Sequence, residues 1–316
     1  MNFIKRHIDA WKKIGGLAVA LAFMPCFATM AQQLGQFTQY RSNGLVINPA
    51  YAGADRVPSL TFVNRSQWSG IDGAPATQTF SAHSLFKKEH FGLGMIIIND
   101  KIGIHSNLNA LGVYSYRIKF NRDTYLSMGI QMGMNRKRSD YASLATQTQV
   151  PNDPKLSSLD VAQTSFEFGT GIYIKSPKFE VGLSAPKLFP AKSAYSDSVT
   201  LELNRSHYFL LARYLSRLSH NMEIQPGLLV KHLPGLPLSV DLNMDLIFKK
   251  VILMGLSYRS YGSINSILQA KITPQLRFGY SFDSPVAKNA VLDGNSHELM
   301  VNYIFKFSNH RISGSR

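Results

Sequence analysis

The sequence predicts an all-β fold: a transmembrane antiparallel β-barrel of about 14 strands, preceded by a signal peptide. Three observations lead to this prediction. Apolar and polar residues alternate over long stretches, no amphipathic helix pattern of three turns follows residue 31, and aromatic residues make up 11% of the chain. Aromatic side chains line both interfaces of a membrane barrel.

The alternation is clearest in three segments of the C-terminal third. In "PQLRFGYSFD" (274–283), every second residue from Leu276 to Phe282 is apolar or aromatic, and the residues between them are polar or glycine. Residues 237–248 and 296–307 follow a similar pattern. Successive side chains of a strand point to opposite faces, so this period predicts strands.

Segments of this kind recur along the chain, and many reach the roughly 9–11 residues that a tilted strand needs to cross a bilayer. Inside hydrocarbon every backbone polar group must be paired within the protein, which favours a closed barrel over an open sheet. We expect strands at 59–68, 76–86, 91–99, 106–119, 124–134, 164–174, 178–184, 206–217, 221–231, 237–248, 251–259, 263–272, 274–283 and 296–307.

The connections between these strands also favour an outer-membrane barrel. The long connections 135–163, 185–205 and 284–295 follow the fifth, seventh and thirteenth expected strands. Connections after even-numbered strands are short, as in "NRD" (121–123) and "LSH" (218–220). Long outer loops and short periplasmic turns are typical of outer-membrane barrels, and they place the start of the barrel in the periplasm.

Residues 1–31 have the features of a cleavable signal peptide: four cationic residues, an apolar run from Ile14 to Met24, and small residues before Gln32. The apolar run is shorter than the ~20 residues of a spanning helix. Together with the predicted barrel, export by this signal peptide predicts a multi-pass protein in the outer membrane of a Gram-negative bacterium. The single cysteine, Cys26, lies in this segment, so the mature chain would have no disulfide or thiolate metal site.

Four regions follow from this interpretation: the signal peptide, an ordered periplasmic or lumenal arm at 32–58, the barrel at 59–307 and a C-terminal tail at 308–316. The chain carries a formal charge of +15 that is spread along its length. For an exported protein, the expected counter-charges are outer-membrane lipid, lipopolysaccharide phosphate or an acidic protein surface, and not nucleic acid.

The stretch "QFTQYRSNGLVINPAYAGA" (36–54) is rich in turn residues and has no helical period. It resembles the N-terminal signature of the PorP/SprF family, which are outer-membrane proteins of the type IX secretion system. The segments "NRSQWSGIDGAPATQTFSAHS" (64–84), "GLGMIIINDKIGIHS" (92–106) and "QPGLLVKHLPGLPLSVDLN" (225–243) continue the resemblance in order. The chain departs from the family pattern at Gly44-Leu45 and in its C-terminal tail, which leaves its subgroup and partner open.

The resemblance implies a non-enzymatic role without cofactors. Family members support secretion or surface attachment of large adhesin-type cargo proteins that carry a C-terminal signal, and some serve gliding motility. The implied partners are this cargo and the periplasmic ring or motor components of the secretion machinery. The alternative is an outer-membrane solute channel or a hydrophobic-substrate porter.

No catalytic or metal motif competes with these functions. The chain contains no Gly-x-Ser-x-Gly motif of an esterase. The pairs His83–Ser84 and Ser296–His297 are neighbours on strands, so their side chains face opposite ways. The sequence therefore offers no candidate catalytic or metal-ligating residue.

Four residues of the arm are candidates for a structural or partner-docking role. Asn48 is biased to extended backbone because Pro49 follows it. Gly53 permits a positive φ, and Tyr51 offers both a ring and a hydroxyl. We expect the arm to fold inside or under the barrel, where it plugs the lumen, presents a docking face, or only stabilises the first strand.

Arg65 is a candidate for polar pairing inside the lumen. An arginine facing lipid at the bilayer midplane costs about 2–4 kcal/mol, so its side chain should point inward. Its candidate partners are Asp241, Asp245 and Glu298. Trp68, near the outer end of the same strand, is a candidate interfacial anchor.

Overall fold

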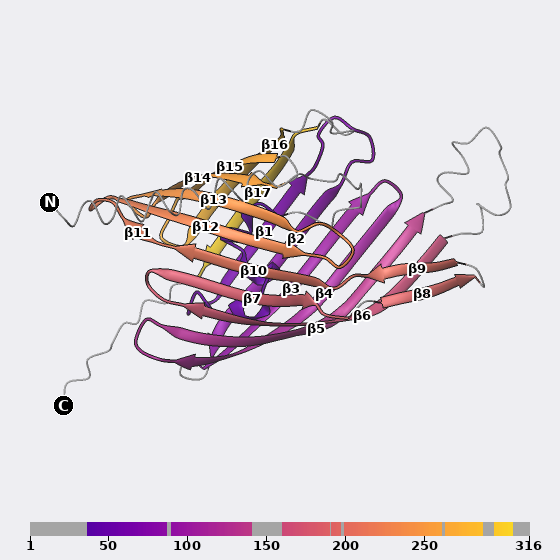
Figure 1. Ribbon diagram of the computed structural model, residues 1–316, viewed down its shortest axis with the longest axis horizontal. Helices are drawn as coiled ribbons and strands as arrows, with labels where there is room; N and C mark the ends of the chain where they lie inside the picture. The colour runs from indigo at the N-terminus through magenta and orange to yellow at the C-terminus, as the bar shows by residue number, and fades with distance from the viewer. Residues whose placement is uncertain are drawn as a thin grey trace. The chain divides into compact units, whose positions relative to one another are not determined.

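The computed structural model describes residues 37–86, 90–140, 160–189, 191–196, 199–260, 263–286 and 294–305 (Figure 1). All of them belong to one compact unit, Leu34–Arg316. The expected signal peptide at 1–31 and tail at 308–316 lie outside the described residues.

The described residues form a closed, antiparallel barrel. Its sheet contains fifteen strands, and because β10 and the two-residue β11 follow one path around Leu215, fourteen strands complete the circle. β1 pairs with β17, and β10 pairs with both β7 and β12. The strands are β1 (Ser59–Ser66), β2 (Ala76–Phe86), β3 (Phe91–Ile102), β4 (His105–Lys119), β5 (Tyr125–Asp140), β6 (Asp160–Lys175), β7 (Phe179–Lys187), β10 (His207–Tyr214), β11 (Ser216–Arg217), β12 (Met222–His232), β13 (Ser239–Phe248), β14 (Ile252–Arg259), β15 (Ser263–Lys271), β16 (Leu276–Pro285) and β17 (Ser296–Ile304).

The predicted fold class is confirmed, and each of the fourteen predicted strands overlaps a strand of the barrel. The largest boundary error concerns β5 and β6, which extend to Asp140 and from Asp160, beyond the predicted 124–134 and 164–174. The added residues of β5, "NRKRSD", pair with β6 but carry no apolar side chains. They therefore lack the alternation by which a lipid-facing strand is recognised.

The predicted connection 185–205 contains structure that the sequence did not indicate. β8 (Ala191–Ser196) and β9 (Val199–Asn204) pair as a separate two-stranded sheet. The middle parts of the two other long connections, 141–159 and 287–293, lie outside the described residues.

The two faces of the barrel wall differ in chemistry. On β13, Leu242 and Met244 are 45% and 48% exposed, whereas Asp241 and Asp245 are 0% and 1% exposed. The same division holds on β17, where Leu299 is exposed and Glu298 is buried. The apolar face of the predicted alternation therefore points outward, as a barrel in lipid requires. Within the described residues, no helix has the length and hydropathy needed to cross a membrane.

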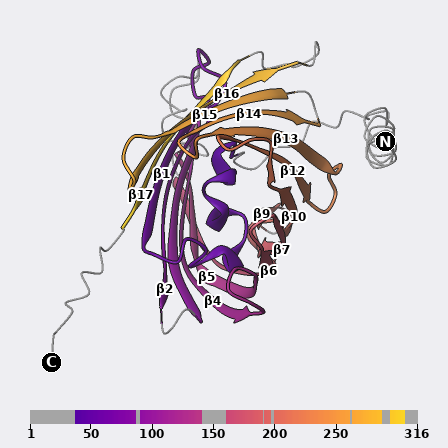
Figure 2. The same ribbon diagram turned by 90° about the vertical axis from the view of Figure 1, so that its left-hand side faces the viewer.

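The interior of the barrel holds the segment that precedes β1 (Figure 2). We call residues 37–55 the lumenal arm. It contains three short 3-10 helices, η1 (Gln39–Arg41), η2 (Gly44–Val46) and η3 (Pro49–Tyr51), and most of its residues are buried.

Candidate functional site

The lumenal arm runs along the barrel from one end to the other. At its start, Thr38 contacts Asp283 and Glu298, near the ends of β16 and β17 that adjoin the long connection 284–295. At its end, Asp55 lies 3.5 Å from His83, near the short turn between β2 and β3. Following the usual arrangement of outer-membrane barrels, we call these the outer end and the periplasmic end.

Asn48 fixes the course of the arm at its third helix. Its backbone is extended, with φ −146° and ψ 114°, as expected before a proline. Its side-chain oxygen accepts a hydrogen bond from the backbone of Ala50 at 2.9 Å and so caps η3. Its side-chain nitrogen donates to the carbonyl of Ile172 on β6 at 3.0 Å, which ties the cap to the barrel wall.

Tyr51 and Gly53 attach the end of the arm to β2, β4 and β6. The Tyr51 ring lies 5.5 Å from that of Tyr173 and 5.6 Å from that of His83. Gly53 has a φ of +77°; its amide donates to His83 at 3.2 Å, and its carbonyl accepts from Arg117 at 2.6 Å. Pro49 occupies the first position of η3, where its missing N–H has no helical partner to lose. A docking role for these arm residues stays a prediction.

Glycines in the wall let the arm approach the strands closely. A Cβ added at Gly129 on β5 would collide with the backbone of Pro49 and Ala50, and one at Gly92 on β3 would collide with the Ala52 carbonyl. The barrel sequence is thus adapted to the arm backbone at these positions. This signal was present in the sequence as glycines on predicted strands, but it could not be interpreted without knowing what lies opposite.

One side of the arm is apolar and packs against β3, β4, β5, β6, β10 and β12. The cluster is completely or almost completely buried. It joins the arm residues Tyr40, Leu45, Ile47, Ala50, Tyr51, Ala52 and Ala54 to the wall residues Ile96, Leu111, Val113, Tyr125, Tyr173, Leu211 and Leu229. An apolar core of this kind inside the barrel stabilises the bound position of the arm.

The other side of the arm is polar and faces β13 to β17. Gln39 accepts a hydrogen bond from Gln269 at 2.7 Å, and the Tyr40 hydroxyl accepts one from Asn243 at 2.6 Å. Arg41 forms a buried ion pair with Asp245. The arm therefore has partners on opposite sides of the barrel.

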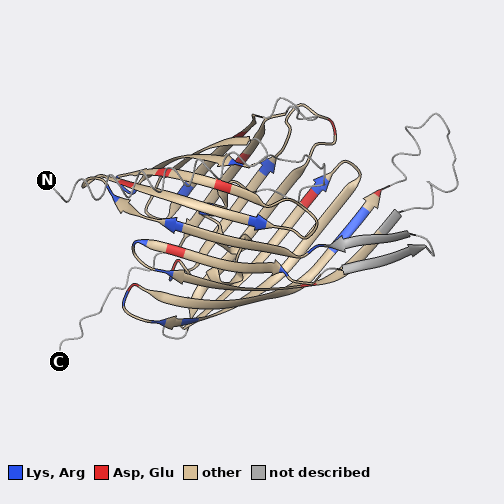
Figure 3. Ribbon diagram, viewed as in Figure 1, with Lys and Arg blue, Asp and Glu red and all other residues tan. Residues whose placement is uncertain are grey.

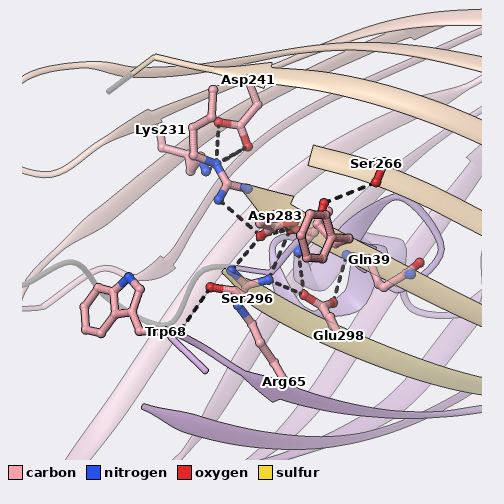
Figure 4. A network of polar contacts seen from close by, with 12 residues as sticks. Gln39, Arg65, Trp68, Lys231, Asp241, Ser266, Asp283, Ser296 and Glu298 are labelled. Atoms are coloured by element: carbon pink, nitrogen blue, oxygen red, sulfur yellow. Dashed lines mark hydrogen bonds and ion pairs between the residues drawn. The ribbon is translucent and has the colours of Figure 1, made fainter. Parts of the chain in front are cut away.

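Arg65 points inward and joins the arm to the wall (Figure 4). Its guanidinium lies 2.8 Å from Glu298 and 2.7 Å from Asp283, and it donates to the Thr38 hydroxyl at 3.2 Å. Arg65 and Glu298 are direct register partners of β1 and β17, which accounts for their contact. Asp283 was not among the predicted partners, although the alternation of 274–283 places it on the same inward face as Ser281.

Asp241 and Asp245 are also buried in the lumen, but of the three alternative partners of Arg65 it is Glu298 that contacts it. Asp241 pairs with Arg259 at 3.1 Å and with Lys231 at 2.9 Å, whereas Asp245 pairs with Arg41 of the arm. The reason is their position on β13, which is separated from β1 by β14 to β17. Neighbouring strands and the arm supply nearer cations.

A second ionic cluster lies toward the periplasmic end. Glu180 on β7 forms ion pairs with Arg213 on β10 and, at 3.3 Å, with Lys175 on β6. Arg213 also donates to the backbone carbonyl of Arg41 at 2.8 Å. This cluster was not predicted. The sequence identifies β6, β7 and β10 by their apolar residues, and no pattern in it links the three charged residues on these strands.

Trp68 lies in the turn after β1 and is half-buried, with a φ of +48°. Its amide lies 3.3 Å from the Ser296 hydroxyl, to which it donates, and its side chain points away from the ionic network (Figure 4). Its predicted role as an interfacial anchor stays a prediction.

The described residues contain no group of three or more His, Cys, Asp or Glu that could hold a metal ion. His83, one of the histidines weighed for catalysis, contacts the arm through Gly53 and Asp55. His297, the other, lies 2.7 Å from the Tyr280 hydroxyl. Both histidines thus have partners of their own within the described residues.

Comparison with known proteins gives one strong family match and several fold matches. A family model described as "Type IX secretion system membrane protein PorP/SprF" matches residues 29–303. No curated protein sequence matches. Among solved structures, a TodX mutant described as a monoaromatic hydrocarbon channel matches with a TM-score of 0.50 and 9% identity, over 84% of this chain and 94% of that chain. The Acinetobacter baumannii outer membrane protein Omp33 matches with a TM-score of 0.46 and 12% identity, over 79% and 98%.

At such identities the structural matches concern the fold alone, and the TodX match agrees with a closed β-barrel. The family match is of a different kind, because it extends over most of the sequence, including the lumenal arm and all but the end of the barrel. The chain therefore belongs to the PorP/SprF family of type IX secretion system membrane proteins.

Proposed function

We propose that this protein is a non-enzymatic outer-membrane component of the type IX secretion system that acts by binding protein partners. Its task is to support secretion or surface attachment of a large, adhesin-type cargo protein with a C-terminal signal. The observation that carries this proposal is the lumenal arm, which lies inside the barrel and contacts opposite walls.

The arm argues against the alternative, a solute channel or hydrophobic-substrate porter. Passage of a solute would require the arm to leave the lumen. That movement would separate the buried pair of Arg41 and Asp245 and expose the apolar cluster around Leu45 and Tyr51. Departure of Arg41 would leave the Asp245 carboxylate on the wall without its cation. Loss of one partner from a buried ion pair costs about 3–5 kcal/mol, which favours the arm in its bound position.

A closed barrel leaves its two ends as the surfaces on which partners bind. At the outer end, β5, β6 and the hairpin of β8 and β9 extend beyond the other strands (Figure 1). This end would meet the secreted cargo. The periplasmic end, where the arm joins β1, would meet the ring or motor components of the secretion machinery.

Two measurements test the proposal. Planar-bilayer conductance of the purified mature protein should show no open pore, whereas a variant lacking residues 37–54 should conduct. Co-purification from detergent should recover a secreted C-terminal-signal protein of the same organism, or periplasmic ring subunits. A large conductance of the unaltered protein, together with no recovery of either partner, would favour the channel instead.

A further inference from the structure

The periplasmic turns share a short pattern. The described chain contains five of these turns, and at each an exposed cationic residue is followed directly by an exposed apolar residue. The pairs are Lys119–Phe120, Lys178–Phe179, Arg217–Leu218, Lys250–Val251 and Lys271–Ile272. We call these ten residues, together with Arg56, Arg122 and Lys249, the periplasmic rim.

The periplasmic rim contains eight cationic residues, and Figure 3 shows that cationic and acidic residues both occur at this end of the barrel. Among the described residues, Asp123 lies 3.8 Å from Arg56, and Glu223 lies 3.7 Å from both Arg217 and Lys250. The side chain of Glu223 is only 12% exposed. The eight cationic residues of the rim outnumber these two carboxylates.

The turn between β4 and β5 adds a pocket to this pattern. The pocket has a volume of about 540 Å³ and is lined by Arg56, Lys119, Phe120, Asn121, Arg122 and Asp123. The guanidinium of Arg56 donates to the backbone carbonyl of Arg122 at 3.0 Å, which holds a cation at the pocket wall. Phe120 is 63% exposed beside these cations. The pocket thus combines positive charge with an exposed ring.

We propose that the periplasmic rim binds anionic glycerophospholipids of the inner leaflet of the outer membrane. The cationic groups contact the phosphates, and the apolar residue beside each one enters the boundary between headgroups and acyl chains. Long cationic side chains reach a headgroup layer in this way while their neighbours stay in apolar surroundings.

The distribution of the pairs favours lipid over a protein partner. The pairs lie on turns from β4–β5 through β15–β16, and so extend around most of the barrel. Lipid surrounds a barrel on all sides, whereas a protein partner contacts one sector. Clusters of Lys and Arg beside a membrane segment also bind anionic lipid by electrostatic attraction. This inference does not depend on the proposed role in secretion.

The test compares two matched variants of the full mature chain. The rim variant carries Arg122→Gln, Lys178→Gln, Lys249→Gln and Lys250→Gln. The control variant carries Lys101→Gln, Arg136→Gln, Arg138→Gln and Arg205→Gln, which removes four exposed cationic residues at the outer end. Heat-modifiable migration on gels shows that each variant folds.

Lipid retention is measured by native mass spectrometry after equilibration with equal amounts of phosphatidylglycerol and phosphatidylcholine. The unaltered protein and the control variant should retain phosphatidylglycerol preferentially. In the rim variant, the ratio of retained phosphatidylglycerol to phosphatidylcholine should be about tenfold lower. High salt should reduce the preference of the unaltered protein.

Three results would overturn the proposal. One is an equal preference of the rim and control variants. Another is thermal stabilisation by inorganic phosphate alone that equals the effect of phosphatidylglycerol. The third is a rim variant that keeps its lipid preference but loses recovery of periplasmic ring subunits, because the rim would then bind an acidic protein surface.

Discussion

Arg41 in the lumenal arm and Asp245 on β13 form an ion pair across 204 residues of sequence, and both side chains are 2% exposed. The pair lies inside the barrel, where both side chains are almost completely shielded from solvent. It therefore makes the position of the arm and the fold of the wall depend on each other.

The first prediction concerns this pair. Asp245→Ala should lower the free energy of unfolding by about 3–5 kcal/mol, because it leaves the Arg41 guanidinium buried without its carboxylate. The double variant Arg41→Met with Asp245→Leu should lose much less, since no unpaired charge remains. Urea unfolding of the refolded barrel in lipid measures both. Equal losses in the single and double variants would show that the pair does not hold the arm.

The second prediction uses the close approach of the arm to the wall. Gly129→Val should displace the arm, because a Cβ there collides with the backbone of Pro49 and Ala50. The matched control is Gly112→Val on β4, where a Cβ meets only the Met132 carbonyl, at 3.8 Å. Planar-bilayer recordings should show conductance for the first variant and none for the second. Silent recordings from a folded Gly129→Val protein would mean that the arm is not what closes the lumen.

The third prediction separates the partners of Arg65. Arg65→Ala leaves the two carboxylates of Asp283 and Glu298 without their shared guanidinium, so it should destabilise the barrel more than Asp283→Asn does. The expected loss for Arg65→Ala is about 3–5 kcal/mol. Thermal unfolding followed by heat-modifiable gel migration ranks the two variants. The opposite ranking would place the main stabilising contact elsewhere.

The fourth prediction concerns Tyr51, whose ring packs between Tyr173 and His83. Tyr51→Ala should cost about 3–5 kcal/mol, as expected for removal of a large buried aromatic side chain, while Tyr51→Phe keeps the ring and should cost less. The same unfolding assay serves as the measurement. Similar losses for the two variants would assign the contribution of Tyr51 to its hydroxyl group.

The sequence predicted the barrel well because alternation is a local signal. From Asp241 to Asp245 on β13, polar residues face the lumen and apolar residues face outward. The side that each residue faces can therefore be predicted from its type. The end of β5 was not predicted, because the polar and charged residues 135–140 lack the apolar alternation of a lipid-facing strand.

The candidate site was only partly predictable. Arg65 and Glu298 could be expected to meet inside the barrel, because inward polar residues need partners. The pairing of Asp245 with Arg41 could not, since it depends on where the arm crosses the lumen. That course is set by non-local packing of the apolar arm residues, Leu45 and Tyr51 among them, in one cluster with residues of six strands, which no sequence period records.

The last prediction tests which end of the barrel faces outward, on which the assignment of the periplasmic rim depends. If the signal peptide is removed after residue 31, the mature chain has no cysteine, so single cysteines can be introduced without background labelling. Ser69→Cys lies in the exposed turn between β1 and β2 at the outer end, and Ser219→Cys lies in the exposed turn after β11 at the periplasmic end. A membrane-impermeant maleimide added to intact cells should label the first variant and not the second, whereas both should react after the outer membrane is permeabilised. Labelling of Ser219→Cys alone in intact cells would reverse the orientation and would place the cationic rim on the cell surface.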